Sequence, residues 1–365
     1  PQNFSGSIST WESHYNITYS LIQDGFTGTG NISGIPLFCD ISSSNYTLAS
    51  NSPCLNAGDD GTTMGFYDFL GCSDIYNGPV WHVDTTGSNS TGDGSLDDPF
   101  ADIEYAMSIA VVGDTILVAP GTYYENIEIS NDKQLIIGSY YLTTMDTSYI
   151  SSTILDGGGS TSSPVLQFKA NSDSTHFTGF TITNSAYAGV YCNTSTSLHL
   201  VKVNKVSHSI ISNNSGRGGV QIEYSNLILS DVVIKNNSDR GGIVVYYNSH
   251  ADVSNSIIEN NSGSGNYTAG ITTTTYADLD IRNSIIRNNS GEGIDAYQGT
   301  ITAEDLTIEG NGGNGFYGND VNITINRGSI SNNGGTGYYG NDNSANFDSL
   351  TVMNNSGDGL KFSFQ

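Results

Sequence analysis

Hydrophobic and polar positions in the second half of the chain follow one short pattern that recurs. A β-branched pair is followed by a polar residue, two asparagines and a Gly-rich turn, as in Ile210-Ile211-Ser212-Asn213-Asn214-Ser215-Gly216. Seven copies occur, and the steps between their Asn pairs (Gly310 opens the pair in the fifth copy) are 23, 24, 28, 22, 22 and 22 residues. A fixed period in this range indicates a solenoid.

The residues between the copies predict what each repeat looks like. Runs such as Ile243-Val244-Val245-Tyr246 and Leu279-Asp280-Ile281 are short, β-branched or aromatic, and alternate in polarity, which is typical of strands. Gly or Asn interrupts every run before it reaches helical length, and the Leu pattern of leucine-rich repeats is absent. About 22 residues divided into three short strands by tight turns predict one coil of a parallel β-helix.

The recurring asparagines predict an internal ladder. Coils of a parallel β-helix stack about 4.8 Å apart, so equivalent side chains lie above one another and their amides can hydrogen-bond along the stack. Asn and Gly also tolerate the left-handed backbone of a sharp corner. The alternative is an array of ligand-binding asparagines. The residues assigned to the ladder are the first of each pair: Asn213, Asn236, Asn260, Asn288, Asn332 and Asn354.

Residues 80–126 carry a different pattern, which predicts a strand, a polar loop, a short helix, a second strand and a turn. Asp98-Pro99 is a helix-start signal. Ile103, Ala106, Met107 and Ala110 then share one face of a helix of about ten residues. A short amphipathic helix before a solenoid covers the apolar side chains and strand edges at its open end.

Three motifs of this segment support a family resemblance. They are Gly92-Asp93-Gly94-Ser95, Gly113-Asp114-Thr115-Ile116, and Pro120-Gly121-Thr122-Tyr123 with Glu125. The segment resembles the N-terminal cap of the secreted right-handed parallel β-helix proteins, the pectin-lyase-like superfamily, and the likeness covers roughly residues 80–365. It implies an all-β fold, a right-handed parallel β-helix solenoid of roughly ten coils with a short N-terminal capping helix.

Residues 1–79 resemble the last coil and tail of a preceding β-helix, as in Ser52-Pro53-Cys54-Leu55-Asn56-Ala57-Gly58. The predicted organisation is therefore a terminator-like segment (1–79), a cap (80–126) and β-helix repeats (127–365) that are open at the C-terminus. Two interpretations follow. In one, the chain is part of a longer protein with adjacent β-helix domains. In the other, residues 1–35 of one copy complete the coil at residues 350–365 of the next, which gives a head-to-tail filament.

The charge balance narrows the possible partners. Lys and Arg number 11 against 36 Asp and Glu, a net charge of −25. This balance excludes a nucleic-acid backbone reader, disfavours an anionic membrane surface, and suits a soluble extracellular or cell-surface protein. No apolar run is long enough for membrane insertion. Copies of the chain itself, adjacent β-helix domains and glycans or other polysaccharides remain as expected partners.

No cofactor is required by the sequence, and Ca²⁺ is the one metal that it suggests. The candidate ligands are the carboxylates of an acidic loop, Asp84, Asp93, Asp97 and Asp98, because Ca²⁺ takes oxygen ligands. The alternative is a cap loop held by local hydrogen bonds between side chains and backbone.

Cysteines and glycosylation sequons agree with an oxidising, secretory setting. Cys39, Cys54 and Cys72 are disulfide candidates, and the pairs considered are Cys54–Cys72 and Cys39–Cys54. Thirteen Asn-x-Ser/Thr triplets occur, of which five lie in expected surface loops: Asn3, Asn45, Asn89, Asn193 and Asn266.

Catalysis is the alternative to a structural role. A polysaccharide lyase needs a base beside bound uronate, and the weak candidates are Arg217 and Arg240, each just before Gly-Gly, with Asp231 and Glu223 nearby. A hydrolase needs two carboxylates on one face, for which Asp295, Glu304, Asp305 and Asp320 are available. Against catalysis on uronates, an anionic substrate is repelled by a strongly negative protein.

Paired tyrosines complete the picture. Tyr123-Tyr124, Tyr246-Tyr247 and Tyr338-Tyr339 suggest either an aromatic strip for sugar stacking or pairs in which one ring packs inside and the other covers the sheet. The sequence as a whole predicts an extracellular structural or adhesive β-helix, with a polysaccharide-active lyase or hydrolase as the alternative.

Overall fold

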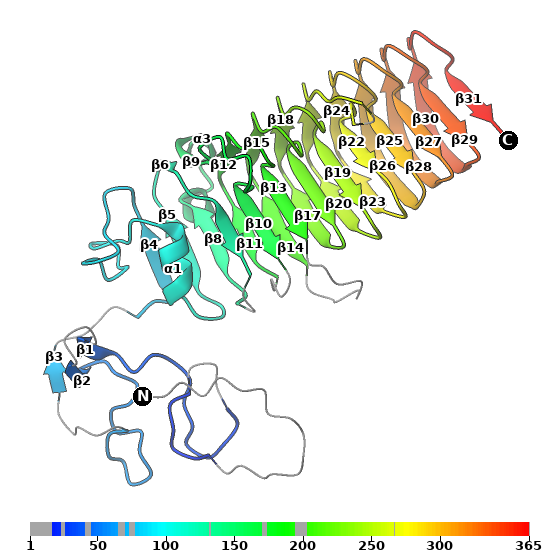
Figure 1. Ribbon diagram of the computed structural model, residues 1–365. Helices are drawn as coiled ribbons and strands as arrows, with labels where there is room; N and C mark the ends of the chain where they lie inside the picture. The colour runs from blue at the N-terminus through cyan, green and yellow to red at the C-terminus, as the bar shows by residue number, and fades with distance from the viewer. Residues whose placement is uncertain are drawn as a thin grey trace. The chain divides into compact units, whose positions relative to one another are not determined.

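The computed structural model describes residues 17–22, 26–40, 45–64, 70–72, 77–130, 133–169, 174–193, 203–265 and 267–364. They divide into two compact units, Pro1–Asn77 and Gly78–Gln365. The second unit is a right-handed parallel β-helix, as the sequence predicts (Figure 1).

One side of the solenoid is a parallel sheet of ten strands, one from each successive coil (Figure 1). We call it the ten-stranded sheet. Its strands are β7 (Ile127–Ile129), β10 (Leu166–Lys169), β13 (Val190–Asn193), β16 (Val220–Glu223), β19 (Ile243–Tyr246), β22 (Ile271–Thr273), β25 (Ile294–Tyr297), β27 (Phe316–Asn319), β29 (Tyr338–Asn341) and β31 (Leu360–Ser363).

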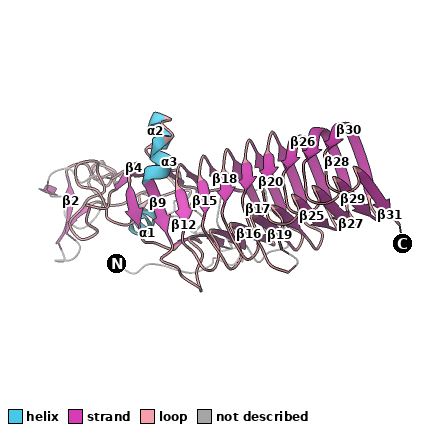
Figure 2. Ribbon diagram, turned by 90° about the horizontal axis from the view of Figure 1, so that it is seen from above, coloured by secondary structure: helices cyan, strands magenta, loops and turns pink. Residues whose placement is uncertain are grey.

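The remaining strands of the solenoid form two parallel rows that merge near the C-terminus (Figure 2). The first row is β4 (Val80–Val83), β5 (Thr115–Val118), β8 (Ile136–Ser139), β11 (His176–Thr178), β14 (Asn204–Ser207), β17 (Asn226–Ser230), β20 (His250–Ser254) and β23 (Asp278–Arg282). The second is β6 (Gly121–Tyr123), β9 (Thr153–Asp156), β12 (Thr181–Thr183), β15 (Ile210–Ser212), β18 (Val233–Lys235), β21 (Ile257–Glu259) and β24 (Ile285–Arg287). Three bent ten-residue strands continue both rows: β26 (Thr300–Glu309), β28 (Asn322–Ser331) and β30 (Ser344–Met353).

Apolar columns fill the interior of the coils. Val220 of β16 is in register with Ile243 of β19, which is in turn in register with Ile271 of β22, and all three side chains are fully buried. The alternation of the sequence therefore points one set of side chains inward on every coil. Because each methylene buried contributes about 0.8 kcal/mol, the columns are the main source of stability in a solenoid of this length.

The asparagine ladder exists, but the sequence analysis placed it one residue too early. The side-chain amide of Asn237 donates to Asn261 Oδ1 and the amide of Asn261 to Asn289 Oδ1, both at 3.0 Å. These side chains are buried. The complete ladder is formed by the second residue of each pair: Asn214, Asn237, Asn261, Asn289, Asn311, Asn333 and Asn355.

The first residue of each pair makes the corner instead. Its backbone is left-handed, with φ between 54° and 58°, and its side chain is exposed. The predicted ladder residues Asn213, Asn236, Asn260, Asn288, Asn332 and Asn354 are thus the turn residues. The physical reason is that a left-handed residue turns its side chain out of the coil, and the next residue then points inward. The roles of turn and ladder fall on neighbouring asparagines.

The ladder also explains the glycine that precedes each strand of the ten-stranded sheet from β13 to β31. A Cβ on Gly219 would lie 2.8 Å from Asn237 Nδ2, and a Cβ on Gly270 would lie 2.7 Å from Asn289 Nδ2. A side chain at either position would displace the ladder amide. The glycine of each repeat is therefore a packing requirement.

Helix α1 (Ile103–Ile109) covers the start of the solenoid, and Ile103 and Ala106 are fully buried. It is shorter than predicted and begins after Asp102, not at Asp98-Pro99, because Phe100 instead bridges to Val83 of β4. The backbone N–H groups of Ile103 and Glu104 donate to the Glu125 carboxylate at 3.0 Å each. The glutamate that follows Pro-Gly-Thr-Tyr is thus the N-terminal cap of this helix.

A second motif residue holds the cap strands together. Trp81 Nε1 donates to the buried Asp114 carboxylate at 2.7 Å, and the N–H of Val111 donates to the same oxygen at 2.9 Å. Helices α2 (Tyr141–Thr144) and α3 (Ser148–Ser152) stand together beside β9 (Figure 2). Among the described residues, no helix has the length and apolarity that crossing a membrane requires.

The first unit contains a small sheet, β1 (Phe38–Asp40), β2 (Asn45–Ala49) and β3 (Leu70–Cys72). A disulfide joins Cys39 to Cys72, with their Cα atoms 5.9 Å apart, and Cys54 is buried without a disulfide. Both pairings considered from the sequence were therefore wrong. Strand β2 pairs with both β1 and β3, which brings these two cysteines together.

Candidate functional site

The outer face of the ten-stranded sheet carries a row of polar and aromatic side chains. On each strand the second and fourth residues point outward because the first and third pack inside. These outward residues include Tyr191, Asn193, Gln221, Glu223, Tyr246, Thr272, Asp295, Tyr297, Tyr317 and Tyr339. The turn before each strand adds side chains that fold over them.

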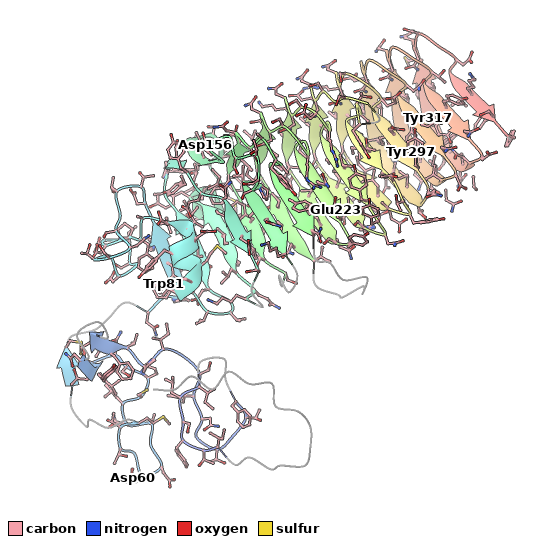
Figure 3. The ribbon with its side chains drawn as sticks, in the orientation of Figure 1. Asp60, Trp81, Asp156, Glu223, Tyr297 and Tyr317 are labelled. Atoms are coloured by element: carbon pink, nitrogen blue, oxygen red, sulfur yellow. A yellow bond between two sulfur atoms is a disulfide. The ribbon has the colours of Figure 1, made fainter. Side chains whose placement is uncertain are left out.

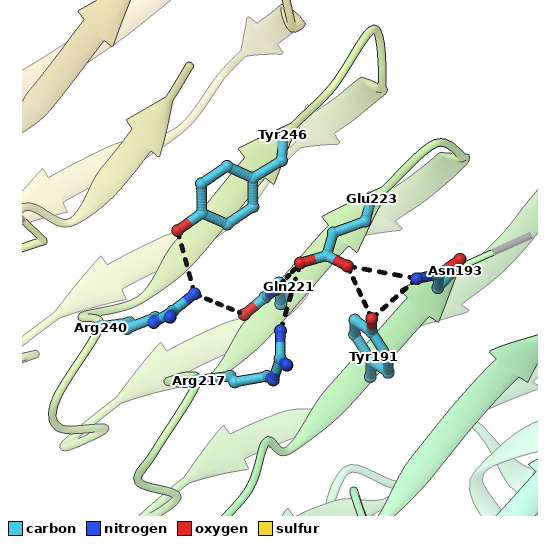
Figure 4. A network of polar contacts seen from close by, with 7 residues as sticks. All are labelled: Tyr191, Asn193, Arg217, Gln221, Glu223, Arg240 and Tyr246. Atoms are coloured by element: carbon cyan, nitrogen blue, oxygen red, sulfur yellow. Dashed lines mark hydrogen bonds and ion pairs between the residues drawn. The ribbon is translucent and has the colours of Figure 1, made fainter. Parts of the chain in front are cut away.

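Glu223 is the centre of a polar network on this face (Figure 4). Tyr191 Oη donates to its carboxylate at 2.7 Å and Asn193 Nδ2 at 3.2 Å. Arg217 Nη1 donates at 3.2 Å from the turn before β16, and Gln221 donates from the same strand. Tyr191 and Asn193 come from the preceding coil, and Arg217 and Gln221 come from the coil of Glu223, so the stacking of coils brings the two sets together.

Arg240 extends the network to the next coil (Figure 4). Its Nη1 donates to Gln221 Oε1 at 3.4 Å and to Tyr246 Oη at 3.1 Å. Gln221 is fully buried beneath these side chains. Because its amide donates to Glu223 and its oxygen accepts from Arg240, it links the two arginine sites.

Both guanidinium groups also lie over tyrosine rings. The Arg217 Cζ is 4.7 Å from the Tyr187 ring centroid and 5.3 Å from that of Tyr191. The Arg240 Cζ is 5.0 Å from the centroid of Tyr267. Cation–π contacts of this kind contribute about 0.5–1 kcal/mol at exposed sites and about 2 kcal/mol or more where water is excluded.

The electrostatics of this network hold its charges in place. Arg217 forms an ion pair with Glu223 whose side chain is 14% exposed. Burial, followed by the hydrogen bond to Glu223, raises the pKa of Tyr191 to about 12. Burial likewise raises the pKa of Tyr246 above its ordinary value. At neutral pH both tyrosines therefore stay protonated, so the Tyr191 hydroxyl donates to Glu223 and the Tyr246 hydroxyl accepts from Arg240.

Three coils further along, the same face carries the side chains of Tyr297 and Tyr317 (Figure 3). Asp295 of β25 is 7% exposed, and its Oδ1 has no hydrogen-bond partner among the described residues. Burial, and then the charge of Glu292, raise its pKa to about 7. Tyr297 and Tyr317 lie beside it, with their ring centroids 5.7 Å apart.

The weak catalytic candidates of the sequence separate in space. Arg217 and Arg240 do lie on neighbouring coils of one face, as expected. Asp231 follows β17 in the other part of the coil, where it lies 3.8 Å from His208. Glu223, and not Asp231, is the carboxylate that pairs with Arg217.

The hydrolase candidates are also dispersed. Glu304 and Asp305 belong to the bend of β26 and pair with Arg327, Asp305 at 2.9 Å. Asp320 is exposed in the turn between β27 and β28. Of these carboxylates Asp295 alone lies on the outer face of the ten-stranded sheet.

The acidic loop of the cap forms local hydrogen bonds. Asp84 Oδ1 accepts from the N–H of Thr86 at 2.8 Å, and Asp93 Oδ1 accepts from the N–H of Ser95 at 2.9 Å. Asp97 and Asp98 are exposed. Within the described ranges, no group of three or more His, Cys, Asp or Glu side chains is placed to hold a metal ion.

The glycosylation candidates have different surroundings. Asn3 and Asn266 lie outside the described residues, and Asn45 is exposed at the start of β2. The amide of Asn89 donates to Asp102 at 2.5 Å, and that of Asn193 donates to Tyr191 Oη at 2.8 Å. A glycan on either of the last two would break these contacts.

Sequence reasoning placed Glu223 near Arg217 and Arg240 but missed the other members of the network, Tyr191, Asn193, Gln221 and Tyr246. The signal was the glycine that precedes each strand from β13 onward, because the second and fourth residues after it point outward. Counting from Gly189, Gly219 and Gly242 finds Tyr191 with Asn193, Gln221 with Glu223, and Val244 with Tyr246. The Asn pair lies in the turn just before these glycines and does not by itself show which residues of the next strand point outward.

The family profile of the right-handed beta helix region matches residues 168–270 and 269–365, which together make up more than half of the chain. The chain belongs to this family. This match confirms the right-handed parallel β-helix that the resemblance in the sequence implied. In the comparison with curated protein sequences, nothing matches this β-helix chain.

Solved structures similar to this β-helix include enzymes that act on polysaccharides. Pectate lyase Pel9A is 16% identical over 77% of this chain and 79% of its own, with a TM-score of 0.46. The complex of XylC with xylose is 13% identical over 73% and 69%, with a TM-score of 0.38. The A-module of mannuronan C-5 epimerase AlgE4 from Azotobacter vinelandii is 11% identical over 71% and 88%, with a TM-score of 0.36.

Proposed function

We propose that this chain is an extracellular structural or adhesive β-helix that binds glycans along the outer face of the ten-stranded sheet. The observation that carries the proposal is the network around Glu223, in which two tyrosines and two arginines of adjacent coils are fixed by one another. The chain's net charge of −25 supports a soluble protein.

The chemistry of the network suits binding of a sugar chain. Tyrosine rings supply flat apolar surface with a polar tip, and each ring costs little conformational entropy when it is already fixed. The guanidinium planes and amide groups between the rings donate hydrogen bonds. Because the side chains are held by Glu223 before any ligand arrives, the entropic cost of binding is reduced.

The same pairing is unsuitable for the lyase that we considered as the alternative. A lyase base must accept a proton, whereas the Arg217 guanidinium donates to the Glu223 carboxylate at 3.2 Å and is held there in an ion pair. One observation favours a hydrolase instead: Asp295, whose pKa is raised to about 7, is a carboxyl that can carry a proton at neutral pH. A hydrolase also needs a second carboxylate at a defined separation.

The test compares two ion pairs of the solenoid. Glu223→Gln removes the acceptor of the network, and Glu259→Gln is the matched control, because Glu259 pairs with Arg287 at 2.8 Å on another face of the coil. Affinity electrophoresis against a panel of neutral and acidic polysaccharides measures binding. We expect Glu223→Gln to weaken retention of the bound polymer by about tenfold and Glu259→Gln to leave it unchanged.

Three outcomes contradict the proposal. Equal retention of both variants would move the binding surface away from the network, and no retention of any polymer would remove glycan binding. Release of new reducing ends or unsaturated products by the wild-type chain would establish the alternative, a polysaccharide lyase or hydrolase.

A finer form of the structural role is head-to-tail assembly, in which residues 1–35 of one copy complete the coil at residues 350–365 of the next. Its support is the apolar character of Leu360, Phe362 and Phe364, which lie in and directly after β31. Apolar strand edges of this kind associate. Deletion of residues 1–35 should abolish polymers seen by electron microscopy, and polymers that persist would contradict this form of the proposal.

A further inference from the structure

Cations lie over the tyrosines of the ten-stranded sheet in a repeated arrangement. Arg217 covers Tyr191, and Arg240 covers Tyr267 beside Tyr246. Near the C-terminus, Lys361 Nζ lies 4.6 Å from the ring centroid of Tyr339. The chain therefore places its own basic groups on this aromatic row at both of its ends.

Two tyrosines in the middle of the row, Tyr297 and Tyr317, carry no such cation among the described residues. Their ring planes meet at 59° with the centroids 5.7 Å apart, and both side chains are half-buried. They belong to consecutive coils, since β25 pairs with β27. An angled aromatic wall is thus left uncovered at this position.

Buried oxygens without partners lie beside that wall. Asp295 is in register with Tyr317 on one side and with Thr272 on the other. Thr272 is 1% exposed, and neither its Oγ1 nor Asp295 Oδ1 has a hydrogen-bond partner among the described residues. Buried polar atoms without partners cost about 1–3 kcal/mol each, so two neighbouring ones in a native structure call for a partner such as an ordered water or a ligand.

The charge of the position is negative. Glu292 precedes β25, accepts a hydrogen bond from Thr268 Oγ1 at 3.3 Å, and acts electrostatically on Asp295. No basic side chain pairs with either carboxylate in the described part of the chain. Two carboxylates and two tyrosine rings together are the chemistry that recognises an organic cation.

We propose that Asp295, Glu292, Tyr297 and Tyr317 form a binding site for the ammonium group of an amino sugar. The ammonium donates to the Asp295 carboxylate and lies against the tyrosine rings, as Lys361 does on Tyr339. The pyranose ring packs in the angle between Tyr297 and Tyr317. The inference rests on the proposed function in one respect, that the ligand is a saccharide.

The experiment is a calorimetric titration of the full chain with three probes. They are a glucosamine oligomer, its fully N-acetylated counterpart and tetralysine. Variants are Asp295→Asn, Tyr317→Ala and Tyr317→Phe, with Asp320→Asn as the matched control because Asp320 is an exposed carboxylate one turn beyond β27. Circular dichroism verifies that each variant is folded.

We expect the glucosamine oligomer to bind the wild-type chain about tenfold more tightly than the acetylated oligomer does. Asp295→Asn should remove this preference, Tyr317→Ala should weaken binding, Tyr317→Phe should restore most of it, and Asp320→Asn should have no effect. Equal binding of both oligomers, or a preference that survives in folded Asp295→Asn, would overturn the site. Binding of tetralysine in place of the glucosamine oligomer would overturn the saccharide assignment.

Failure of this inference and failure of the proposed function give different results. If Glu223→Gln loses neutral polysaccharides while Asp295→Asn behaves as the wild type, the network binds glycans and the ammonium site is wrong. If Asp295→Asn loses the glucosamine oligomer while Glu223→Gln retains every polymer, the ammonium site stands and the network is not the binding surface.

Discussion

The two halves of the outer face of the ten-stranded sheet share one backbone geometry. They differ in whether the chain supplies a partner for the carboxylate at their centre. Around β13, β16 and β19, the Glu223 carboxylate accepts from an arginine, a tyrosine and two amides. Around β25 and β27, the Asp295 carboxylate is as deeply buried and Oδ1 has no partner among the described residues. The scaffold is the same, so the difference arises from which residues occupy the second and fourth positions of each strand.

This comparison separates a stabilising role from a binding role. A carboxylate that the chain pairs with its own arginine stabilises the folded state. A buried carboxylate without such a partner costs stability when it is ionised, and protonation or a bound cation removes that cost. Removing the carboxylate should therefore lower the free energy of unfolding in the Glu223 half and raise it in the Asp295 half.

The largest effect should come from the ladder that both halves share. Asn237→Ala, beneath the paired half, and Asn289→Ala, beneath the unpaired half, each remove a buried amide that donates two and accepts two hydrogen bonds. We expect each to lower the free energy of unfolding by about 3 kcal/mol, measured by denaturant unfolding. The control is Asn236→Gly, at a left-handed turn residue, which should cost less than about 0.5 kcal/mol.

Similar losses of unfolding free energy for Asn237→Ala and Asn289→Ala would show that the two halves of the ten-stranded sheet differ only in their surface side chains. A larger loss for Asn236→Gly than for Asn237→Ala would contradict the assignment of the ladder to the second asparagine.

The next effect is the loss of the paired carboxylate. Glu223→Gln removes the negative charge that compensates Arg217, whose side chain is 30% exposed. We expect the free energy of unfolding at neutral pH to fall by about 2 kcal/mol. An unchanged unfolding midpoint would mean that the network does not hold its side chains in place.

The smallest effect, and the one of opposite sign, concerns Asp295. Its pKa is raised from an ordinary 3.8 to about 7 in the folded chain, so the folded state binds the proton more tightly than the unfolded state does. The stability that this provides is complete below pH 3.8 and is lost as the pH rises through 7. Asp295→Asn should therefore match the wild type near pH 4 and exceed it by about 1–2 kcal/mol near pH 8.

Thermal unfolding of both proteins across this pH range measures the difference. A variant less stable than the wild type at high pH would show that the Asp295 carboxylate has a stabilising partner, and the contrast between the two halves would disappear.

The fold was predictable because every coil repeats the same constraints. The β-branched pairs, the Asn pairs and the cap motifs each predict the solenoid independently, and the structure and the family profile confirm it. The exact ladder position was not predictable from the Asn pair, since both residues are asparagine. Only the left-handed backbone of Asn213 and its equivalents decides which side chain points inward.

The site was predictable in part. Arg217, Arg240 and Glu223 were recognised as neighbours on adjacent coils, but Asp231 was not excluded, because the number of residues in a turn does not reveal which face a side chain occupies. The sequence could not predict that Asp295 Oδ1 has no hydrogen-bond partner among the described residues, because this depends on three-dimensional packing. The prediction of the disulfide partners failed for a similar reason. The order of Cys39, Cys54 and Cys72 along the chain does not indicate which strands pair.

The central claim is that this face binds saccharides without cleaving them. Isothermal titration of the wild-type chain with the polysaccharide that it retains best tests the claim directly, because binding and turnover give different heat signals. We predict an isotherm that saturates and returns to the baseline after each injection. A sustained heat flow proportional to the polymer remaining, with products accumulating in the cell, would contradict the account.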